Sequence, residues 1–227
     1  MSRLREELVR RLYAAADRAK APAMQAYMKS SMPYLGIQAS PLRAICKDVF
    51  AGLAFADSES WKHEVLAIWR AAEFREERYA AIELAKHKSA GAFQRIAALP
   101  MHREMIVTGA WWDVVDAIAS GPLYRLLAND RGAMASAMRE WANGNDMWLR
   151  RSSIICQLPA KAQTDLALLY DCIGPSLDSP EFFLRKAIGW ALRQYARTDP
   201  AEVARYVAEN EARLSPLSRR EALRHIA

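Results

Sequence analysis

Cysteine, proline and glycine are all scarce in this chain of 227 residues. The three cysteines, Cys46, Cys156 and Cys172, are odd in number and show no paired metal-ligand spacing. This pattern argues against a disulfide framework or a zinc site and favours buried, reduced thiols in a cytoplasmic protein. Ten prolines and nine glycines are too few for a fibrous or disordered chain. The sequence therefore predicts an ordinary folded protein.

Long apolar runs and cofactor motifs are also missing. No run reaches the roughly 18 apolar residues that a membrane span needs, and the N-terminal segment MSRLREELVRRL has no apolar core, so neither a membrane protein nor an exported one is expected. The histidines are scattered without metal spacing, which places them on surfaces and helix ends: His63, His87, His102 and His225. No glycine-rich phosphate loop or dinucleotide fingerprint is present. No metal and no cofactor are expected.

What the chain does have is a large apolar fraction, 52%, and a net charge of +6. The charge admits a polyanionic partner without requiring one. The cations come in small groups inside helical patterns, as in Arg150 with Arg151, Arg185 with Lys186 and Arg219 with Arg220. A binding surface on folded elements is therefore more plausible than a disordered basic arm.

Apolar residues recur at spacings of three and four along almost the whole chain, for example in REELVRRLYAAAD and PAEVARYVAEN. This periodicity predicts helices nearly throughout and no strand. Helix breaks are expected at Pro22, Pro33 with Gly36, Pro41, Pro100, Gly121 with Pro122, Gly144, Pro180 and Pro216. They leave helices of about 10 to 16 residues joined by short turns, which implies helix pairs.

A short motif repeats along the chain. RYAAI begins at residue 78, VVDAI at 114 and RRSSI at 150, each 36 residues after the last, and RKAIG follows 35 residues later at 185. The column before the motif holds Glu76, Trp112, Trp148 and Phe183. Such a period predicts an all-α solenoid of stacked helix pairs with a curved, concave surface, formed by residues 1–227 as a single domain.

The stretch WWDVVD, residues 111–116, places two carboxylates in an apolar region. Asp113 falls in the first turn of its helix, where an acidic residue suits the helix dipole. Asp116 shares a helix face with Trp112 and stands where the other repeats carry Ala80, Ser152 and Ala187. Because burying a lone carboxylate is costly, we expect Asp116 to face an open groove. The alternative is that Asp116 pairs with a neighbouring arginine or caps a helix end.

Most of the seven tryptophans are expected in the core. Trp61, Trp69 and Trp141 lie among aliphatic residues at helical spacing, and Trp111 joins them beside Val115 and Ile118. Trp190 differs, because Lys186, Trp190, Arg193 and Arg197 form one stripe of a helix. An indole among cations is typical of a surface that contacts nucleic acid. Arg150 and Arg151 after Trp148 repeat this pattern more weakly.

Five ordered segments carry a resemblance to a known family: YMKSSMPYLGIQASPLR, TGAWWDVVD, DMWLRRSSIICQL, EFFLRKAIGWALRQYARTDPAEVARYV and LSPLSRREALRHI. With them the chain resembles the AlkD family of alkylpurine DNA glycosylases. The resemblance implies a superhelical solenoid of HEAT-like antiparallel helix pairs with a concave, positively charged DNA-binding groove. Gly109, Pro159 and Leu42 stand where relatives often have basic residues, which bears on phosphate affinity and not on the chemistry.

The resemblance also assigns residues. It implies that Trp112, Asp116 and Trp190 surround the deoxyribose of the damaged nucleotide. Arg151 and Arg193 correspond to arginines of the groove, and Tyr27 and Gln38 to residues of N-terminal helices that meet the DNA. We expect further DNA contacts from Lys29, Arg43, Arg150 and Lys186.

The implied activity is hydrolysis of the glycosidic bond of N3- and N7-alkylated purines, such as 3-methyladenine and 7-methylguanine, in duplex DNA. This is base excision repair by a monofunctional glycosylase that needs no cofactor, acts as a monomer and leaves the base unflipped. The cationic base is already a good leaving group, so the sugar, which gains oxocarbenium character, is what must be stabilised. A carboxylate and two indole faces suit that task. Two alternatives stay open: a noncatalytic binder of damaged or branched DNA, and a protein-binding scaffold.

Overall fold

The computed structural model describes residues 2–226. The described chain is helical, without strands, so the all-α prediction is confirmed. Its internal contacts divide it into two compact units, Met1–Gln94 and Arg95–Ala227. The single repeat domain expected for residues 1–227 stays a prediction.

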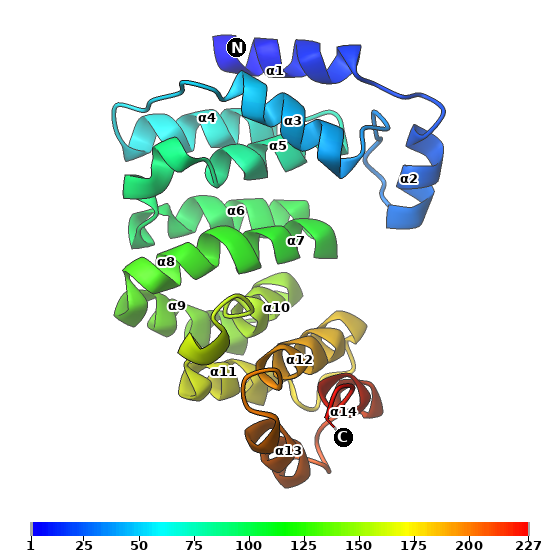
Figure 1. The fold of residues 1–227 in the computed structure, drawn as a ribbon, viewed down its shortest axis with the longest axis vertical. Helices are drawn as coiled ribbons and strands as arrows, with labels where there is room; N and C mark the ends of the chain where they lie inside the picture. The colour runs from blue at the N-terminus through cyan, green and yellow to red at the C-terminus, as the bar shows by residue number, and fades with distance from the viewer. Residues whose placement is uncertain (1, 227) are drawn as a thin grey trace. The chain divides into compact units, whose positions relative to one another are not determined.

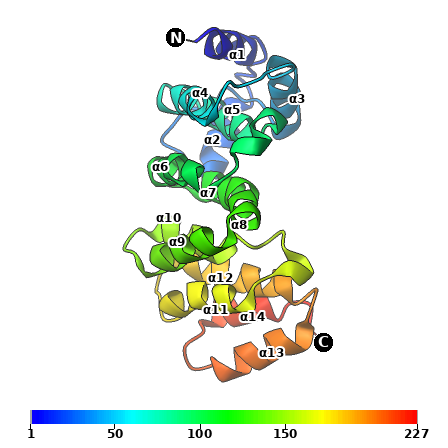
Figure 2. The ribbon, with the colours of Figure 1, turned by 90° about the vertical axis from the view of Figure 1, so that its left-hand side faces the viewer.

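The first unit contains five α-helices and one 3-10 turn among its described residues: α1 (Arg3–Ala14), α2 (Ala21–Met28), α3 (Ala39–Val49), α4 (Ser58–Arg70), α5 (Arg75–Ala85) and η1 (Lys88–Phe93). α4 and α5 lie side by side, and α3 packs on α5 (Figures 1 and 2). The core between them includes Trp61 and Trp69, both buried as predicted. Polar caps start two of these helices, where Ser2 and Asp57 accept backbone hydrogen bonds at α1 and α4.

The segment between α2 and α3 is extended and is held by one carboxylate. Glu76, fully buried on α5, accepts hydrogen bonds from the backbone N–H groups of Leu35, Gly36 and Ile37 at 2.9, 2.9 and 3.0 Å. Gly36 has φ +87°, and a Cβ there would lie 2.0 Å from the Asp17 carbonyl oxygen. The turn therefore requires glycine. Three donors offset the cost of burying the Glu76 charge.

The second unit continues with nine α-helices and short irregular turns in its described part: η2 (Ile96–Ala98), α6 (Leu99–Gly109), α7 (Trp112–Ile118), the π-helical turn η3 (Ala119–Leu123), α8 (Tyr124–Asn129), α9 (Arg131–Asn143), α10 (Met147–Ile155), η4 (Lys161–Gln163), α11 (Leu166–Ile173), η5 (Gly174–Ser176), α12 (Phe182–Tyr195), α13 (Pro200–Glu209) and α14 (Pro216–Ala222). α10 packs against both α7 and α12, and α14 packs on α12. α10 is therefore the link between the helix of Asp116 and the helix of Trp190.

One expected helix break and one histidine differ from the sequence expectations. Gly121 and Pro122 do not end a helix but lie in the π-helical turn that joins α7 to α8, because a wider turn accommodates the missing proline N–H. His102 is fully buried in α6 and not at a surface, and burial lowers its pKa to about 3. The helical period alone cannot distinguish a buried histidine from an exposed one.

The repeat period recurs in ion pairs of the second unit, most of whose members lie in helix caps and turns. Bonded partners 34 or 35 residues apart are Arg95 with Asp130, Arg131 with Asp165, and Arg213 with Asp178. A fixed separation in sequence thus corresponds to a fixed step from one helix pair to the next, which is the signature of a helical-repeat fold. Within the described residues, no helix combines the length and apolar character needed to cross a membrane.

Candidate functional site

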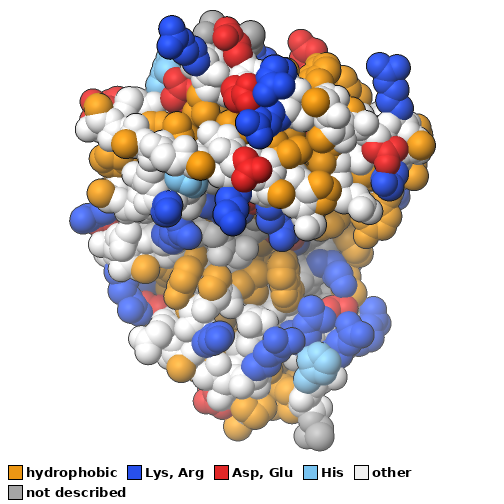
Figure 3. All heavy atoms as spheres, turned by 45° about the horizontal axis from the view of Figure 1, so that its top comes forward, with side chains coloured by type: hydrophobic (Ala, Val, Ile, Leu, Met, Phe, Trp, Pro, Cys, Tyr) orange, Lys and Arg blue, Asp and Glu red, His pale blue; other side chains and the backbone are white. Residues whose placement is uncertain are grey.

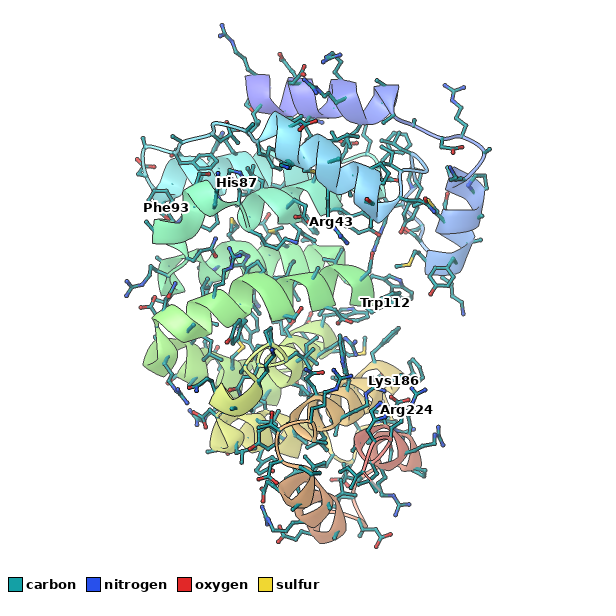
Figure 4. All side chains as sticks on the ribbon, viewed as in Figure 1. Arg43, His87, Phe93, Trp112, Lys186 and Arg224 are labelled. Atoms are coloured by element: carbon teal, nitrogen blue, oxygen red, sulfur yellow. The ribbon has the colours of Figure 1, made fainter. Side chains whose placement is uncertain are left out.

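α7 carries the acidic residues of the WWDVVD stretch. Its buried side consists of Val114, Val115 and Ile118, whereas Trp112 and Asp116 are only half-buried. Asp113 lies in the first turn, as predicted. The helix is short, and Trp112 stands at its start (Figure 4). Trp112 and Asp116 thus occupy the partly exposed side of α7, one turn apart.

Asp116 is held by an arginine of the next repeat. Arg151 on α10 donates from Nε to one carboxylate oxygen at 2.7 Å and from Nη2 to the other at 2.9 Å. The Asp116 side chain keeps 15% of its surface exposed, and that of Arg151 keeps 5%. The expectation of an open-groove position without a partner is therefore wrong, and the arginine-paired alternative is what the structure has. The matching residues of the other repeats are fully buried: Ala80, Ser152 and Ala187.

Arg151 joins three helices. Besides binding Asp116 of α7, its Nη1 donates to the carbonyl oxygen of Phe183 at the start of α12, at 2.5 Å. With all three of these nitrogens bonded inside the protein, Arg151 does not present the free guanidinium that a direct phosphate contact needs. It fixes α7 and α12 relative to α10 instead. A buried, bidentate arginine–carboxylate pair is geometrically strict, so it orients the Asp116 carboxylate closely.

Burial raises the pKa of the Asp116 carboxyl above its usual value, and the nearby charge of Asp113 adds to the rise, while the hydrogen bonds and charge of Arg151 oppose it. The carboxylate therefore depends on Arg151 to remain ionised as pH falls.

Trp190 lies half-buried on α12 between two cations. Lys186 precedes it by one turn and Arg193 follows by one turn, as predicted, while Leu184, Ile188 and Ala191 form the buried side and Tyr195 is only half-buried. Arg197, the fourth member of the predicted stripe, lies beyond the end of α12 and is exposed. The sequence reading missed Glu221 of α14, which accepts from Lys186 Nζ at 3.0 Å and from Arg193 Nη1 at 2.6 Å. Lys186 and Glu221 are 35 residues apart, as are Asp116 and Arg151. This separation of one repeat is the sequence signal from which Glu221 and Arg151 could have been predicted as partners.

The tryptophans of the first turns form an aromatic cluster. Trp111, Trp148 and Phe183 have ring centroids 5.0–6.1 Å apart. Trp148 is buried there, so the idea that it repeats the surface pattern of Trp190 is wrong. Trp141 is buried as predicted, whereas Trp111 is half-buried. Because Trp111 is the N-cap of α7, the cluster joins the start of α7 to α10 and α12.

Arg150, another residue expected to contact DNA, is also hydrogen-bonded within the protein. Arg150 donates from Nη2 to the Pro175 carbonyl oxygen at 2.7 Å and to Ser176 Oγ at 2.9 Å. Figure 3 shows Lys and Arg side chains in small groups with Asp and Glu among them.

Within the described residues, no three His, Cys, Asp or Glu side chains gather as a metal site. All three cysteines are buried and free.

The four site candidates of the first unit are all exposed. Tyr27 on α2 keeps 79% of its surface exposed, and Lys29 ends that helix with φ 48°. Gln38 is the N-cap of α3, and Arg43 projects from α3 (Figure 4). They are free to meet a partner. That they share one DNA surface with the second unit stays a prediction.

Stacked helix pairs with a repeating period define a helical-repeat protein, and comparison with known proteins gives its family. The family model described as DNA alkylation repair enzyme matches residues 8–226, so the chain belongs to this family. A solved structure, a predicted DNA alkylation repair enzyme from Enterococcus faecalis, is similar with 30% identity and a TM-score of 0.77, over 93% of this chain and 97% of that one. No curated protein matches the chain. The resemblance stated from the sequence is confirmed at the level of the family.

Proposed function

We propose that this DNA alkylation repair enzyme is a monofunctional glycosylase that excises cationic N3- and N7-alkylated purines from duplex DNA. The observation that carries the proposal is the oriented, partly exposed Asp116 carboxylate, one helical turn from the half-buried indole of Trp112. Trp190, on a helix that the same arginine joins to α7, is assigned to the other side of the sugar. The protein is further inferred to act as a monomer in the cytoplasm, on DNA of the nucleoid.

The chemistry follows from the charge on the base. An alkylated purine cation leaves as a neutral base, so no general acid is needed, and the positive charge moves to the sugar as the bond stretches. Asp116 stabilises that charge by electrostatic attraction and the indole faces of Trp112 and Trp190 by cation–π contact. A water on the exposed side of the carboxylate attacks the sugar carbon. The fixed carboxylate costs little reorganisation at that moment.

The ion pair with Arg151 modifies the catalytic role of Asp116. Because it neutralises part of the Asp116 charge, the carboxylate acts as one end of a fixed ion pair and not as a lone anion. Its attraction for the sugar is weaker than that of an unpaired carboxylate, but its orientation is set before substrate binds. Arg151 is thus assigned a positioning role, and the phosphate contacts fall to Arg43, Lys186 and Arg193.

The test is product analysis on methylated duplex DNA. We expect wild-type protein to release 7-methylguanine or 3-methyladenine, and Asp116→Asn to lower the single-turnover rate about a hundredfold to a thousandfold while duplex binding persists. Asp113→Asn, on the same helix, is the matched control and should stay within a few-fold. Since Asp116→Asn unbalances a buried ion pair, Trp112→Ala serves as a second variant. No release by a wild-type protein that binds the duplex would reject the proposal.

A noncatalytic binder of damaged or branched DNA is the second candidate, and the ion pair itself favours it. A carboxylate already paired with arginine is the arrangement expected of a structural residue. This candidate predicts salt-dependent duplex affinity, no abasic product and unchanged affinity in Asp116→Asn.

A further inference from the structure

The last helix of the chain packs unusually closely on α12, and a glycine makes this possible. A Cβ at Gly189 would lie 2.5 Å from the Glu221 Cβ and 3.0 Å from the Ser218 carbonyl oxygen. The Ser218 hydroxyl also donates to the Arg185 carbonyl oxygen of α12 at 2.9 Å. The position of α14 on α12 is therefore fixed by contact and by a hydrogen bond.

This packing places one carboxylate between several cations. Glu221 binds Lys186 with one oxygen and Arg193 with the other, and its side chain is only 14% exposed. These interactions, with the charge of Arg224, lower the pKa of Glu221. Figure 4 labels Lys186 and Arg224 at the α12–α14 contact. One negative charge therefore lies among three positive ones.

The two bound cations flank Trp190. Residues 186, 190 and 193 follow at helical spacings of four and three, so they share one stripe of α12. Lysine and arginine side chains are long and lose much rotamer freedom when fixed. Because a single carboxylate holds both, Lys186 and Arg193 are ordered together before any partner arrives.

We propose that Glu221 is a positioning residue of the DNA site: it holds Lys186 and Arg193 on either side of Trp190, so that they grip the DNA backbone next to the nucleotide being processed. This inference rests on the proposed function for its catalytic consequence. Its consequence for DNA binding is independent of that function.

The experiment combines Glu221→Gln with a matched control, Glu211→Gln, which removes the same charge from an exposed glutamate paired with Arg219. Three quantities are measured: the salt dependence of affinity for an unmodified duplex, the single-turnover rate of base release from methylated duplex, and the melting temperature. In Glu221→Gln we expect affinity at low salt to be unchanged or higher and the slope of log K against log salt to steepen by about one. The release rate should fall about tenfold, because the freed cations no longer hold the backbone in register. Glu211→Gln should match wild type in all three.

A second variant tests the position of Glu221 separately from its charge. Gly189→Ala displaces Glu221 without altering net charge, so the release rate should fall while the salt slope stays at the wild-type value. Gly174→Ala is its control, since a Cβ there meets no atom within 4 Å.

The outcomes distinguish the role of Glu221 from the proposed glycosylase function. If Glu221→Gln leaves both the slope and the rate at wild-type values, or if affinity, rate and melting temperature fall together as for general destabilisation, the role of Glu221 is overturned. If wild-type protein binds the duplex but releases no base, the proposed function fails, and the salt slope alone decides the role of Glu221. A steeper slope in Glu221→Gln but not in Glu211→Gln would then support it.

Discussion

Two carboxylates, Glu76 of the first unit and Asp116 of the second, are satisfied in different ways. Glu76 is fully enclosed and accepts three backbone N–H groups of the segment Leu35–Ile37. Asp116 keeps some exposure and is bound by the side chain of Arg151. Backbone amides cannot be exchanged for a ligand, so Glu76 is committed to the fold. An arginine partner leaves one side of the carboxylate open, and Asp116 can therefore serve a site.

The largest effect on stability is expected at Arg151. Replacing it with alanine leaves Asp116 half-buried without its partner, and we expect the free energy of unfolding to fall by about 3–5 kcal/mol. Urea denaturation measures the change. Arg131→Ala, which breaks an exposed pair with Asp165, should cost less than about 1 kcal/mol. Equal losses in the two variants would remove the distinction between a buried and an exposed pair.

A somewhat smaller loss is expected at Glu76. Glu76→Gln removes the negative charge and places a side-chain N–H group against backbone N–H groups, so we expect the free energy of unfolding to fall by about 3 kcal/mol. Hydrogen exchange should show the loss of protection at residues 35–37 first. Glu83→Gln on the same helix, half-buried and paired with Lys86, is the control and should change exchange little. Protection unaltered at 35–37 would contradict the anchoring role.

Acid should destabilise the second unit through His102. Its pKa falls from 6.5 to about 3 on folding, so between these values the unfolded chain binds more protons and stability is lost as pH falls. The slope is at most about 1.4 kcal/mol per pH unit. Unfolding measured from pH 7 to pH 4 should show it, and His102→Gln should flatten it. His225→Gln, at an exposed position, should keep the wild-type slope.

The smallest effects belong to the exposed pairs that follow the repeat. Double-mutant cycles on Arg213 with Asp178 should give a coupling of about 0.2–1 kcal/mol, because solvent screens both groups. A coupling as large as that of Arg151 with Asp116 would mean that the repeat period, and not burial, sets the strength of these pairs.

The sequence predicted the all-helical class and the repeat period because both depend on local spacing. The expected helix length of about 10 to 16 residues is wrong for six described helices, which have six to nine residues: α2, α7, α8, α10, α11 and α14. Trp61, Trp69 and Trp141 are buried, and Leu184, Ile188 and Ala191 form the inner side of α12, as apolar periodicity requires. Sequence reasoning failed at His102, whose residue type suggested a surface position, and at Trp148, whose neighbouring arginines suggested one, because both side chains are buried. Residue type indicates burial on average, and neighbours from other helices decide the particular case.

The sequence proposed residues for the site but not the contacts between them. Asp116 stood out because the other repeats carry small residues at its position, and Trp190 because it lies among cations, whereas Trp112 was selected through the family resemblance. Neither Arg151 as the partner of Asp116 nor Glu221 as the partner of Lys186 and Arg193 could be selected that way. Both partners lie one repeat away, so their contacts depend on how closely successive helices pack.

By itself, the sequence determined that this protein is a stack of helices with a motif that recurs every 35 or 36 residues. The 3.6-residue turn and the apolar pattern are enough to determine that much. Only the tertiary structure decided which charges are free and which are neutralised. An ion pair needs two groups within about 4 Å, and that distance is set by the packing of helices that are far apart along the chain.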